Sequence, residues 1–105
     1  MKFISNYKEL GGDSDVSLSS HIGDITHADK GKILLYLKNG KSDGVRCSAV
    51  YDHVKEFSTG MTVQLYTDEE FYWDSEEIYH FEKYNLELET EFLKKVTARE
   101  ENIRE

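Results

Sequence analysis

The apolar residues of this chain change their spacing at Leu86, and this change limits the folds it can adopt. Before Leu86, short apolar runs are separated by polar or glycine-containing turns, which is typical of short strands. After it, one face with helical spacing is formed by Leu88, Phe92, Val96, Arg99 and Ile103. The 105 residues have the size of one domain. We therefore predict a single α+β domain over 1–105, with an antiparallel sheet of about four or five strands and a C-terminal helix.

The predicted strands are the segments 32–38, 45–51, 61–67, 71–73 and 78–81. The first is a nearly continuous apolar run, which is typical of a strand covered on both faces. Asn39–Gly40 and Asp43–Gly44 tolerate positive φ angles, so we expect a hairpin loop between the first two strands. Residues 52–59 are expected to form a connector to the third strand.

Alternation predicts which strand residues face the core. The inward positions are expected to be Val45, Cys47, Ala49 and Tyr51 on one strand, and Met61, Val63 and Leu65 on the next. A nucleophilic Cys47 would need His53 or His80 as its base. Because its position is inward, we instead expect Cys47 to be a buried small hydrophobe.

Two further segments are expected to be irregular or helical. A short N-terminal helix over 2–10 is predicted by the spacing of Phe3, Ile4, Tyr7 and Leu10, and Gly11–Gly12 would end it. A short strand is expected near 15–18. A helix over 76–84 is the alternative to the strand at 78–81, since Ser75 could cap it.

The negative charge of the chain lies entirely in its last third. Lys and Arg number 13 and Asp and Glu 21, which gives a net charge of −8. Residues 1–67 hold eight acids and eight bases, whereas residues 68–105 hold 13 acids and five bases. Within 68–84 the acids alternate with aromatic residues. A solvated acidic face would explain the charge alone, but the aromatics favour a protein interface, where Tyr and Trp are common anchors.

The acidic and aromatic stretch is the predicted partner-binding site, made of Asp68, Glu69, Glu70, Tyr72, Trp73, Asp74, Glu76 and Glu77. Its carboxylates would attract a basic protein surface, and the same charge disfavours nucleic acid and anionic membranes. On a strand Tyr72 and Trp73 face opposite sides, so one side belongs to the core, and Trp73 is the candidate for it. The carboxylates are expected to be exposed, because unpaired carboxylates are rarely buried.

One cluster carries metal-ligand residue types at close spacing: His21, Asp24, His27 and Asp29. A small metal- or ligand-binding enzyme domain using His21, Asp24 and His27 is therefore one alternative function. The i, i+3, i+6 spacing of His21, Asp24 and His27 would bring their side chains to one side only on a helix. Gly23 lies inside such a helix and disfavours it, so we expect a polar surface loop. The nucleophile, phosphate-loop and zinc-protease motifs are absent from the sequence. We expect no enzyme, no catalytic residues, no metal and no cofactor.

The single cysteine fits a reducing compartment. No apolar run approaches the ~18 residues of a membrane span, and the opening residues lack the pattern of a secretory signal. We therefore expect a cytoplasmic location and no membrane contact.

A small, acidic, aromatic-rich domain of this kind resembles the immunity proteins of bacterial toxin–immunity systems, above all those of contact-dependent growth inhibition. The resemblance covers the whole chain in size and charge, and it rests on composition. It implies a non-enzymatic protein that binds a basic toxin, often a nuclease domain, and blocks its active site or its substrate path. An acidic mimic of nucleic acid, aimed at a DNA-binding protein, would use the same electrostatics and stays open.

Overall fold

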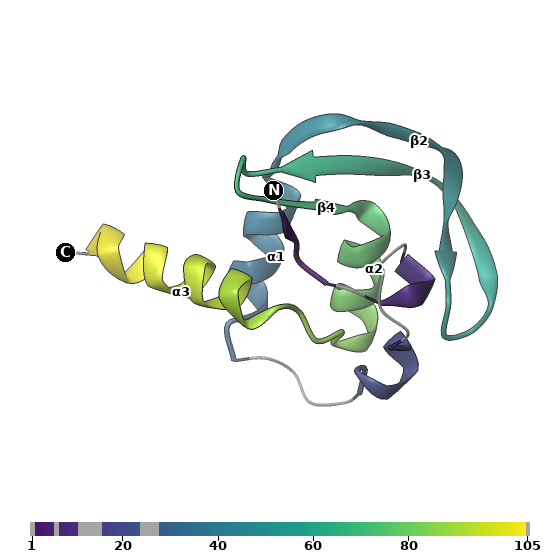
Figure 1. Cartoon of the computed structure of the whole chain (residues 1–105), viewed down its shortest axis with the longest axis horizontal. Helices are drawn as coiled ribbons and strands as arrows, with labels where there is room; N and C mark the ends of the chain where they lie inside the picture. Colours follow the sequence, from purple (N-terminus) through teal and green to yellow (C-terminus); the bar gives the residue numbers. More distant parts are fainter. Residues whose placement is uncertain (1, 6, 11–15, 24–27, 105) are drawn as a thin grey trace.

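A sheet with the strand order β1–β4–β3–β2 forms the centre of the fold (Figure 1). The computed structural model describes residues 2–5, 7–10, 16–23 and 28–104. Three strands are antiparallel: β2 (Lys41–Asp52), β3 (Phe57–Thr67) and β4 (Phe71–Asp74). The short β1 (Lys2–Phe3) adds to β4 in parallel. The α+β class is confirmed, but the antiparallel part of the described chain has three strands instead of four or five.

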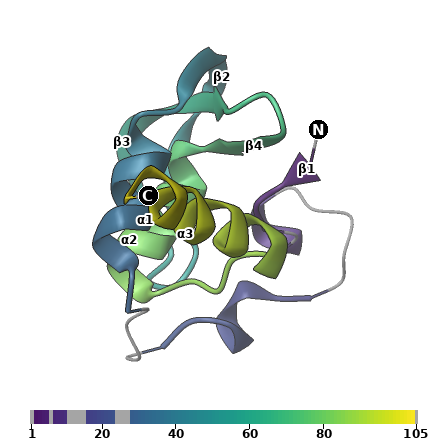
Figure 2. The same cartoon turned by 90° about the vertical axis from the view of Figure 1, so that its left-hand side faces the viewer.

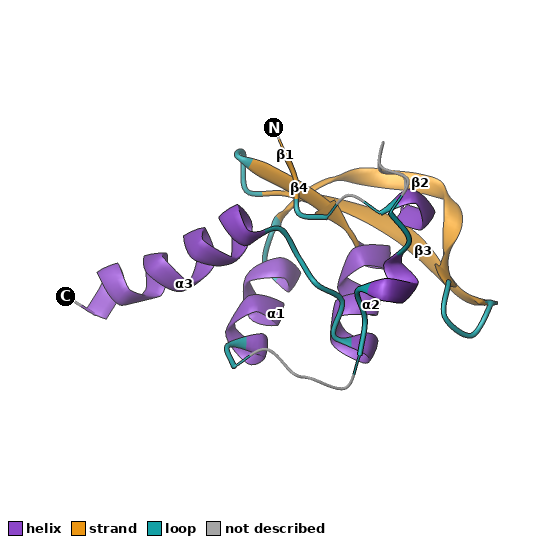
Figure 3. Cartoon of the chain, turned by 60° about the horizontal axis from the view of Figure 1, so that its bottom comes forward, coloured by secondary structure: helices purple, strands orange, loops and turns teal. Residues whose placement is uncertain are grey.

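Three helices pack against this sheet: α1 (Lys30–Lys38), α2 (Ser75–Tyr84) and α3 (Thr90–Arg104). Figure 3 shows α1 and α2 on the same side of the sheet, and α3, seen end-on in Figure 2, lies beside α1. The predicted C-terminal helix is confirmed as α3, and its far end projects from the body of the molecule (Figure 1). None of the helices in the described part of the chain is long and apolar enough to cross a membrane.

The strand predicted at 32–38 is wrong, because this segment forms the helix α1. Ile33 and Leu37, one helical turn apart, are fully buried, whereas Leu35 is 65% exposed. A short, nearly continuous apolar run does not distinguish a strand from a helix by its periodicity. The hairpin loop expected after Asn39 is wrong for the same reason, since residue 41 already begins β2. The hairpin turn lies at 53–56 instead, within the predicted connector.

The predicted strand at 78–81 is also wrong, and its helical alternative is correct. Residues 75–84 form α2, and the residue that caps it is Asp74 rather than Ser75. The Asp74 carboxylate accepts the backbone N–H of Glu77 at 2.9 Å, and the Glu77 carboxyl accepts the N–H of Asp74 at 3.2 Å. This reciprocal pair is a capping box, which satisfies two backbone donors at the start of the helix.

The N-terminal segment differs from the predicted helix over 2–10. Residues 2–3 form β1, and only Lys8–Leu10 turn as a short 3-10 helix, η1. A second 3-10 helix, η2 (Leu18–Ser20), follows Ser17, whose hydroxyl caps it. The strand expected near 15–18 is therefore not formed at 17–18, and residues 11–15 lie outside the described residues.

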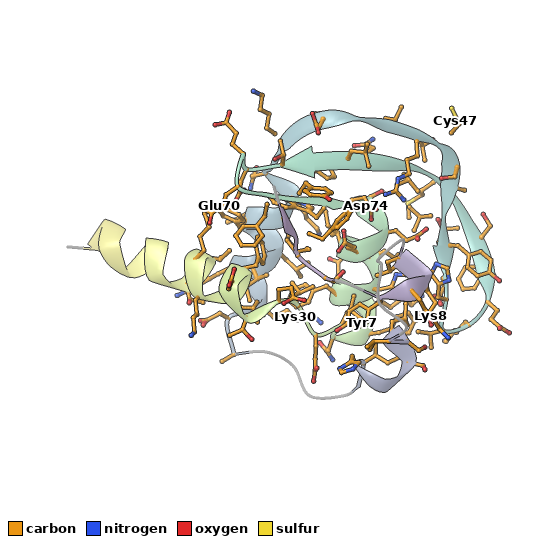
Figure 4. All side chains as sticks on the ribbon, in the orientation of Figure 1. Tyr7, Lys8, Lys30, Cys47, Glu70 and Asp74 are labelled. Atoms are coloured by element: carbon orange, nitrogen blue, oxygen red, sulfur yellow. The ribbon has the colours of Figure 1, made fainter. Side chains whose placement is uncertain are left out.

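The inward positions predicted for β2 are wrong. Val50 and Asp52 are buried, whereas Val45, Cys47 and Tyr51 are exposed. Irregularities in the pairing of β2 with β3 break the simple alternation, because extra residues change which side chains face inward. Figure 4 shows Cys47 on the outer side of the hairpin. On β3, Val63 is buried as predicted and Met61 is exposed.

The core is centred on Trp73, which lies between β4 and the helices. Its side chain is 1% exposed, and its indole N–H donates to the carbonyl of Leu37 at 3.0 Å. The rings of Tyr36 and Phe92 lie against it, with centroid distances of 6.1 and 5.7 Å. The backbone of Gly40 closes the packing around the indole. This arrangement holds α1, β4 and α3 together.

We predict that Gly40→Ala destabilises the protein. An added Cβ would lie 2.5 Å from Cζ2 of Trp73, and the indole cannot retreat without losing its bond to Leu37. Overpacking of this kind costs about 1–3 kcal/mol. The control is Gly31→Ala, which meets nothing within 4 Å in the first turn of α1 and should be neutral or stabilising by up to ~1 kcal/mol. Urea unfolding measures both variants, and equal stabilities would contradict this packing.

Candidate functional site: a groove beside the β3–β4 turn

A groove of about 700 Å³ lies between α1, α3 and the turn that joins β3 to β4. Its apolar lining comes from Leu35 and Tyr36 on α1 and from Val96 on α3. Charged residues complete the lining: Lys32, Lys41, Asp68 and Glu69. Leu35 is the most exposed large apolar side chain of the described residues, so the groove offers an uncovered hydrophobic contact.

Asp68 builds the turn that borders the groove. One of its carboxylate oxygens accepts the backbone N–H groups of Glu70 and Phe71, at 2.9 and 2.6 Å. The other accepts the Tyr36 hydroxyl at 2.5 Å and the Lys95 ammonium at 2.8 Å. Asp68 therefore holds the β3–β4 turn, the Tyr36 side chain on α1 and the Lys95 ammonium on α3 in fixed positions.

The charge on Asp68 is stabilised by these contacts. Burial alone would raise the pKa of this carboxyl, but the hydrogen bonds from Lys95, Tyr36 and the turn backbone lower it to about 2. The same contact with Asp68 raises the pKa of Lys95, against the opposing effect of its burial. The two groups are thus an ion pair throughout the physiological pH range.

The next two carboxylates point toward solvent. Glu70 pairs with Lys95 at 2.9 Å, and Figure 4 places it above α3. Glu69 has a positive φ of 79° and lies 3.8 Å from the ammonium of Lys41, with 80% of its side chain exposed. The exposed pair of Glu69 with Lys41 contributes only about 0–1 kcal/mol, and Glu70 is 60% exposed although Lys95 is only 25% exposed. Both acids are therefore accessible to another cation.

Of the eight residues predicted for partner binding, the structure brings Asp68, Glu69 and Glu70 together at the turn. Tyr72 lies outside this group, half-buried against the ring of Phe3 at a centroid distance of 3.9 Å. The other four, Trp73, Asp74, Glu76 and Glu77, are buried. The expectation that all the acids are exposed is therefore wrong for the last three. Trp73 is a core residue, which leaves it unable to serve as an exposed anchor.

The buried carboxyls of Asp74 and Glu77 each have several hydrogen-bond or ion-pair partners. Besides the capping box, Asp74 lies 3.2 Å from the guanidinium of Arg46 on β2, and the Ser5 hydroxyl donates to Glu77. Burial raises the pKa of both carboxyls, and the mutual repulsion of Asp74 and Glu77 adds to the effect on Glu77. The carboxyls thus connect the N-terminal segment, the hairpin and α2.

Glu76 belongs to a second buried polar cluster, between α2 and the end of β2. Its carboxylate accepts the backbone N–H of Tyr51 at 3.0 Å and lies 3.3 Å from Nε2 of His53. His80 accepts the backbone N–H of His53 at Nε2, while its Nδ1 contacts the Glu76 carbonyl at 2.8 Å. The ring proton of His80 therefore lies on Nδ1, and burial lowers its pKa. Both ring nitrogens of His80 have hydrogen-bond partners in the backbone, which indicates that His80 stabilises the fold.

The predicted metal-ligand cluster is only partly described. Asp24 and His27 lie outside the described residues, and Nδ1 of His21 contacts the Glu87 carboxylate at 2.8 Å. Asp29 precedes α1 as its N-cap residue. Among the described residues, no group of three His, Cys, Asp or Glu side chains has a geometry that could hold a metal ion.

Sequence reasoning missed the helical half of the groove. Leu35 and Tyr36 lie about 60 residues before Val96 in the chain, and the three line one groove only because 32–38 is a helix. The spacing of Ile33 and Leu37 was the available signal, since it places Leu35 on the opposite face of a helix. The pairing of Lys95 with Asp68 had no signal in the sequence beyond complementary charge.

We predict that Glu77→Gln flattens the pH dependence of stability. Because its folded pKa lies well above the ordinary 4.5, the folded wild type holds a proton that the unfolded chain loses first. Its stability therefore falls as pH rises between the two values. The amide of glutamine has no acidic proton to lose and can still contact Asp74 and Ser5, so Glu77→Gln should gain stability relative to wild type as pH rises above 4.5.

Urea unfolding at several pH values between 5 and 8 measures this difference. Glu56→Gln, at an exposed position, is the matched control and should give a curve parallel to wild type. A parallel curve for Glu77→Gln as well would show that Glu77 is ionised in the folded protein.

Comparisons of the chain with protein-family models, with curated proteins and with solved structures found no match.

Proposed function

We propose that this chain is a non-enzymatic binding protein that neutralises a basic protein toxin in the cytoplasm, as immunity proteins do. A nuclease domain is the favoured partner, because its cleft must attract phosphates and is therefore positive. The observation that carries the proposal is the groove itself, where the exposed Leu35 lies beside the exposed carboxylates of the β3–β4 turn.

The charge distribution supports a basic partner. The net charge of −8 arises in residues 68–105, which contain the β3–β4 turn and α3. A field of one sign accelerates the association of a partner of opposite charge. Close to the groove, the exposed pair of Glu69 with Lys41 is weak enough for a partner's Lys or Arg to replace the lysine, and the 60% exposed Glu70 can accept a further cation beside Lys95.

The apolar lining supplies the short-range part of the interaction. Full burial of a Leu side chain contributes about 1.5–3 kcal/mol, and Leu35 presents most of its surface for such burial. Tyr36 is held by its hydroxyl on Asp68, so its ring is already ordered before a partner binds. A pre-ordered aromatic side chain loses little entropy on binding.

The proposed contact surface is therefore Leu35, Tyr36, Glu69 and Glu70, with Asp68 as the positioning residue. Tyr72 remains a candidate at its edge, whereas Trp73, Asp74, Glu76 and Glu77 support the surface from inside. The small metal-binding enzyme receives no support from His21, which contacts Glu87. A nucleic-acid mimic would use the same acids, and the identity of the partner separates the two functions.

The reading frame directly upstream identifies that partner. An upstream protein that ends in a basic toxin domain supports the immunity function, and that domain is the ligand for binding experiments. Growth of cells that produce the toxin domain, with and without this chain, tests neutralisation. Continued toxicity in the presence of the folded chain would overturn the proposal.

We predict that two changes in the groove weaken binding in different ways. Glu69→Gln with Glu70→Gln should slow association and reduce its dependence on salt, because the attracting charge is lost. Leu35→Ala should leave association unchanged and speed dissociation about tenfold, which corresponds to ~1.4 kcal/mol. Surface plasmon resonance at several salt concentrations measures both rates.

The matched control is Glu56→Gln with Glu89→Gln, which removes the same charge from exposed positions outside both the groove and the β3–β4 turn. Equal effects of the two charge pairs would reject the groove as the contact site. Circular dichroism confirms that each variant is folded.

A further inference from the structure

Three aromatic rings surround an ammonium group at the far end of the hairpin from the groove. Phe57 begins β3, and Tyr79 and Tyr84 lie on α2. The Lys83 ammonium lies 5.9, 5.4 and 5.9 Å from the centroids of Phe57, Tyr79 and Tyr84. A cation within about 6 Å of an aromatic face is attracted by the ring quadrupole.

A buried carboxylate increases the negative potential of this site. The hydroxyls of Tyr79 and Tyr84 donate to the same oxygen of Asp52, at 2.7 and 2.5 Å. Burial would raise the pKa of Asp52, but these bonds and those from the turn backbone lower it, so the carboxylate is ionised. The two half-buried tyrosines therefore have an anion at their hydroxyl ends.

The rings are held in place independently of the cation. Asp52 also accepts the backbone N–H groups of Val54 and Lys55, which fixes the hairpin turn. The N–H of His53 is bonded to His80, which attaches this turn to α2. Besides its cation–π contacts, Lys83 donates a hydrogen bond to the Tyr79 hydroxyl at 3.2 Å. Lys83 is exposed and Phe57 is 43% exposed, so a second cation can reach the rings.

We propose that Phe57, Tyr79 and Tyr84 form a binding site for the side-chain ammonium of a lysine from another protein, with Lys83 as the resident cation that the incoming lysine replaces. The incoming ammonium regains the three cation–π contacts that Lys83 gives up, so the exchange costs little. Trimethylation of the incoming lysine strengthens binding, since aromatic cages recognise quaternary ammonium groups. The site is separate from the groove and does not depend on the proposed function.

Emptying the site tests this inference. In Lys83→Met the charge is removed while an apolar side chain of similar length remains. The probe is N-acetyl-trimethyllysine amide, titrated against ¹³C-labelled protein while the aromatic NMR signals of Phe57, Tyr79 and Tyr84 are followed. We expect saturable shifts of all three rings with a dissociation constant in the millimolar range, and at least fivefold weaker binding to wild type, in which Lys83 competes.

Two controls distinguish a cation-binding site from a non-specific hydrophobic surface. N-acetyl-norleucine amide has a similar stem without the charge and should cause no saturable shift. Phe57→Leu in the Lys83→Met background keeps an apolar residue without the ring and should weaken probe binding. Lys83→Gln provides a second emptied site. The proposal is overturned if the three rings do not respond in either emptied variant, or if norleucine amide binds as well as the trimethyllysine probe.

Discussion

The reciprocal contact between Asp74 and Glu77 is the interaction on which the arrangement of the segments depends. It starts α2 directly at the end of β4, without a connecting loop. Arg46 then attaches β2 to this junction, and Ser5 attaches the N-terminal segment. Both carboxyls are buried, so each of these partners compensates a desolvation cost that would otherwise oppose folding. The positions of the hairpin, β1 and α2 follow from this one cluster.

The parts of the fold that the sequence predicted are those with a local signal. The periodicity around Phe92 and Val96 predicted α3, and alternation around Val63 predicted β3. The signal of the segment 32–38 is ambiguous, because a short apolar run is typical of a buried helix as well as of a buried strand, and the helical spacing of Ile33 and Leu37 is only one turn long. For the candidate site, Asp68, Glu69 and Glu70 lie between the predicted strands at 61–67 and 71–73, and the structure places them in the turn that joins β3 to β4. Asp74, Glu76 and Glu77 were assigned to the surface because their partners, among them Ser5 and Arg46, are distant in the chain.

The two proposed binding surfaces share one construction principle. In each, a buried or half-buried aspartate holds tyrosine hydroxyls and also fixes a turn: Asp68 holds Tyr36 at the groove, and Asp52 holds Tyr79 and Tyr84 at the hairpin. Both aspartates are ionised, so each site has a negative charge beside its tyrosine rings. A protein with a long dimension of 44 Å can thereby present two pre-ordered aromatic sites away from each other.

The position of Trp73 has a spectroscopic consequence. It is the only tryptophan of the chain, and its indole lies in the core, bonded to α1 and packed against α3. Its fluorescence therefore reports on the junction of α1, β4 and α3 without any introduced label. Because Tyr36 contacts both the indole and the groove, the emission spectrum is an intrinsic optical probe that connects the interior of this protein with the occupancy of its surface.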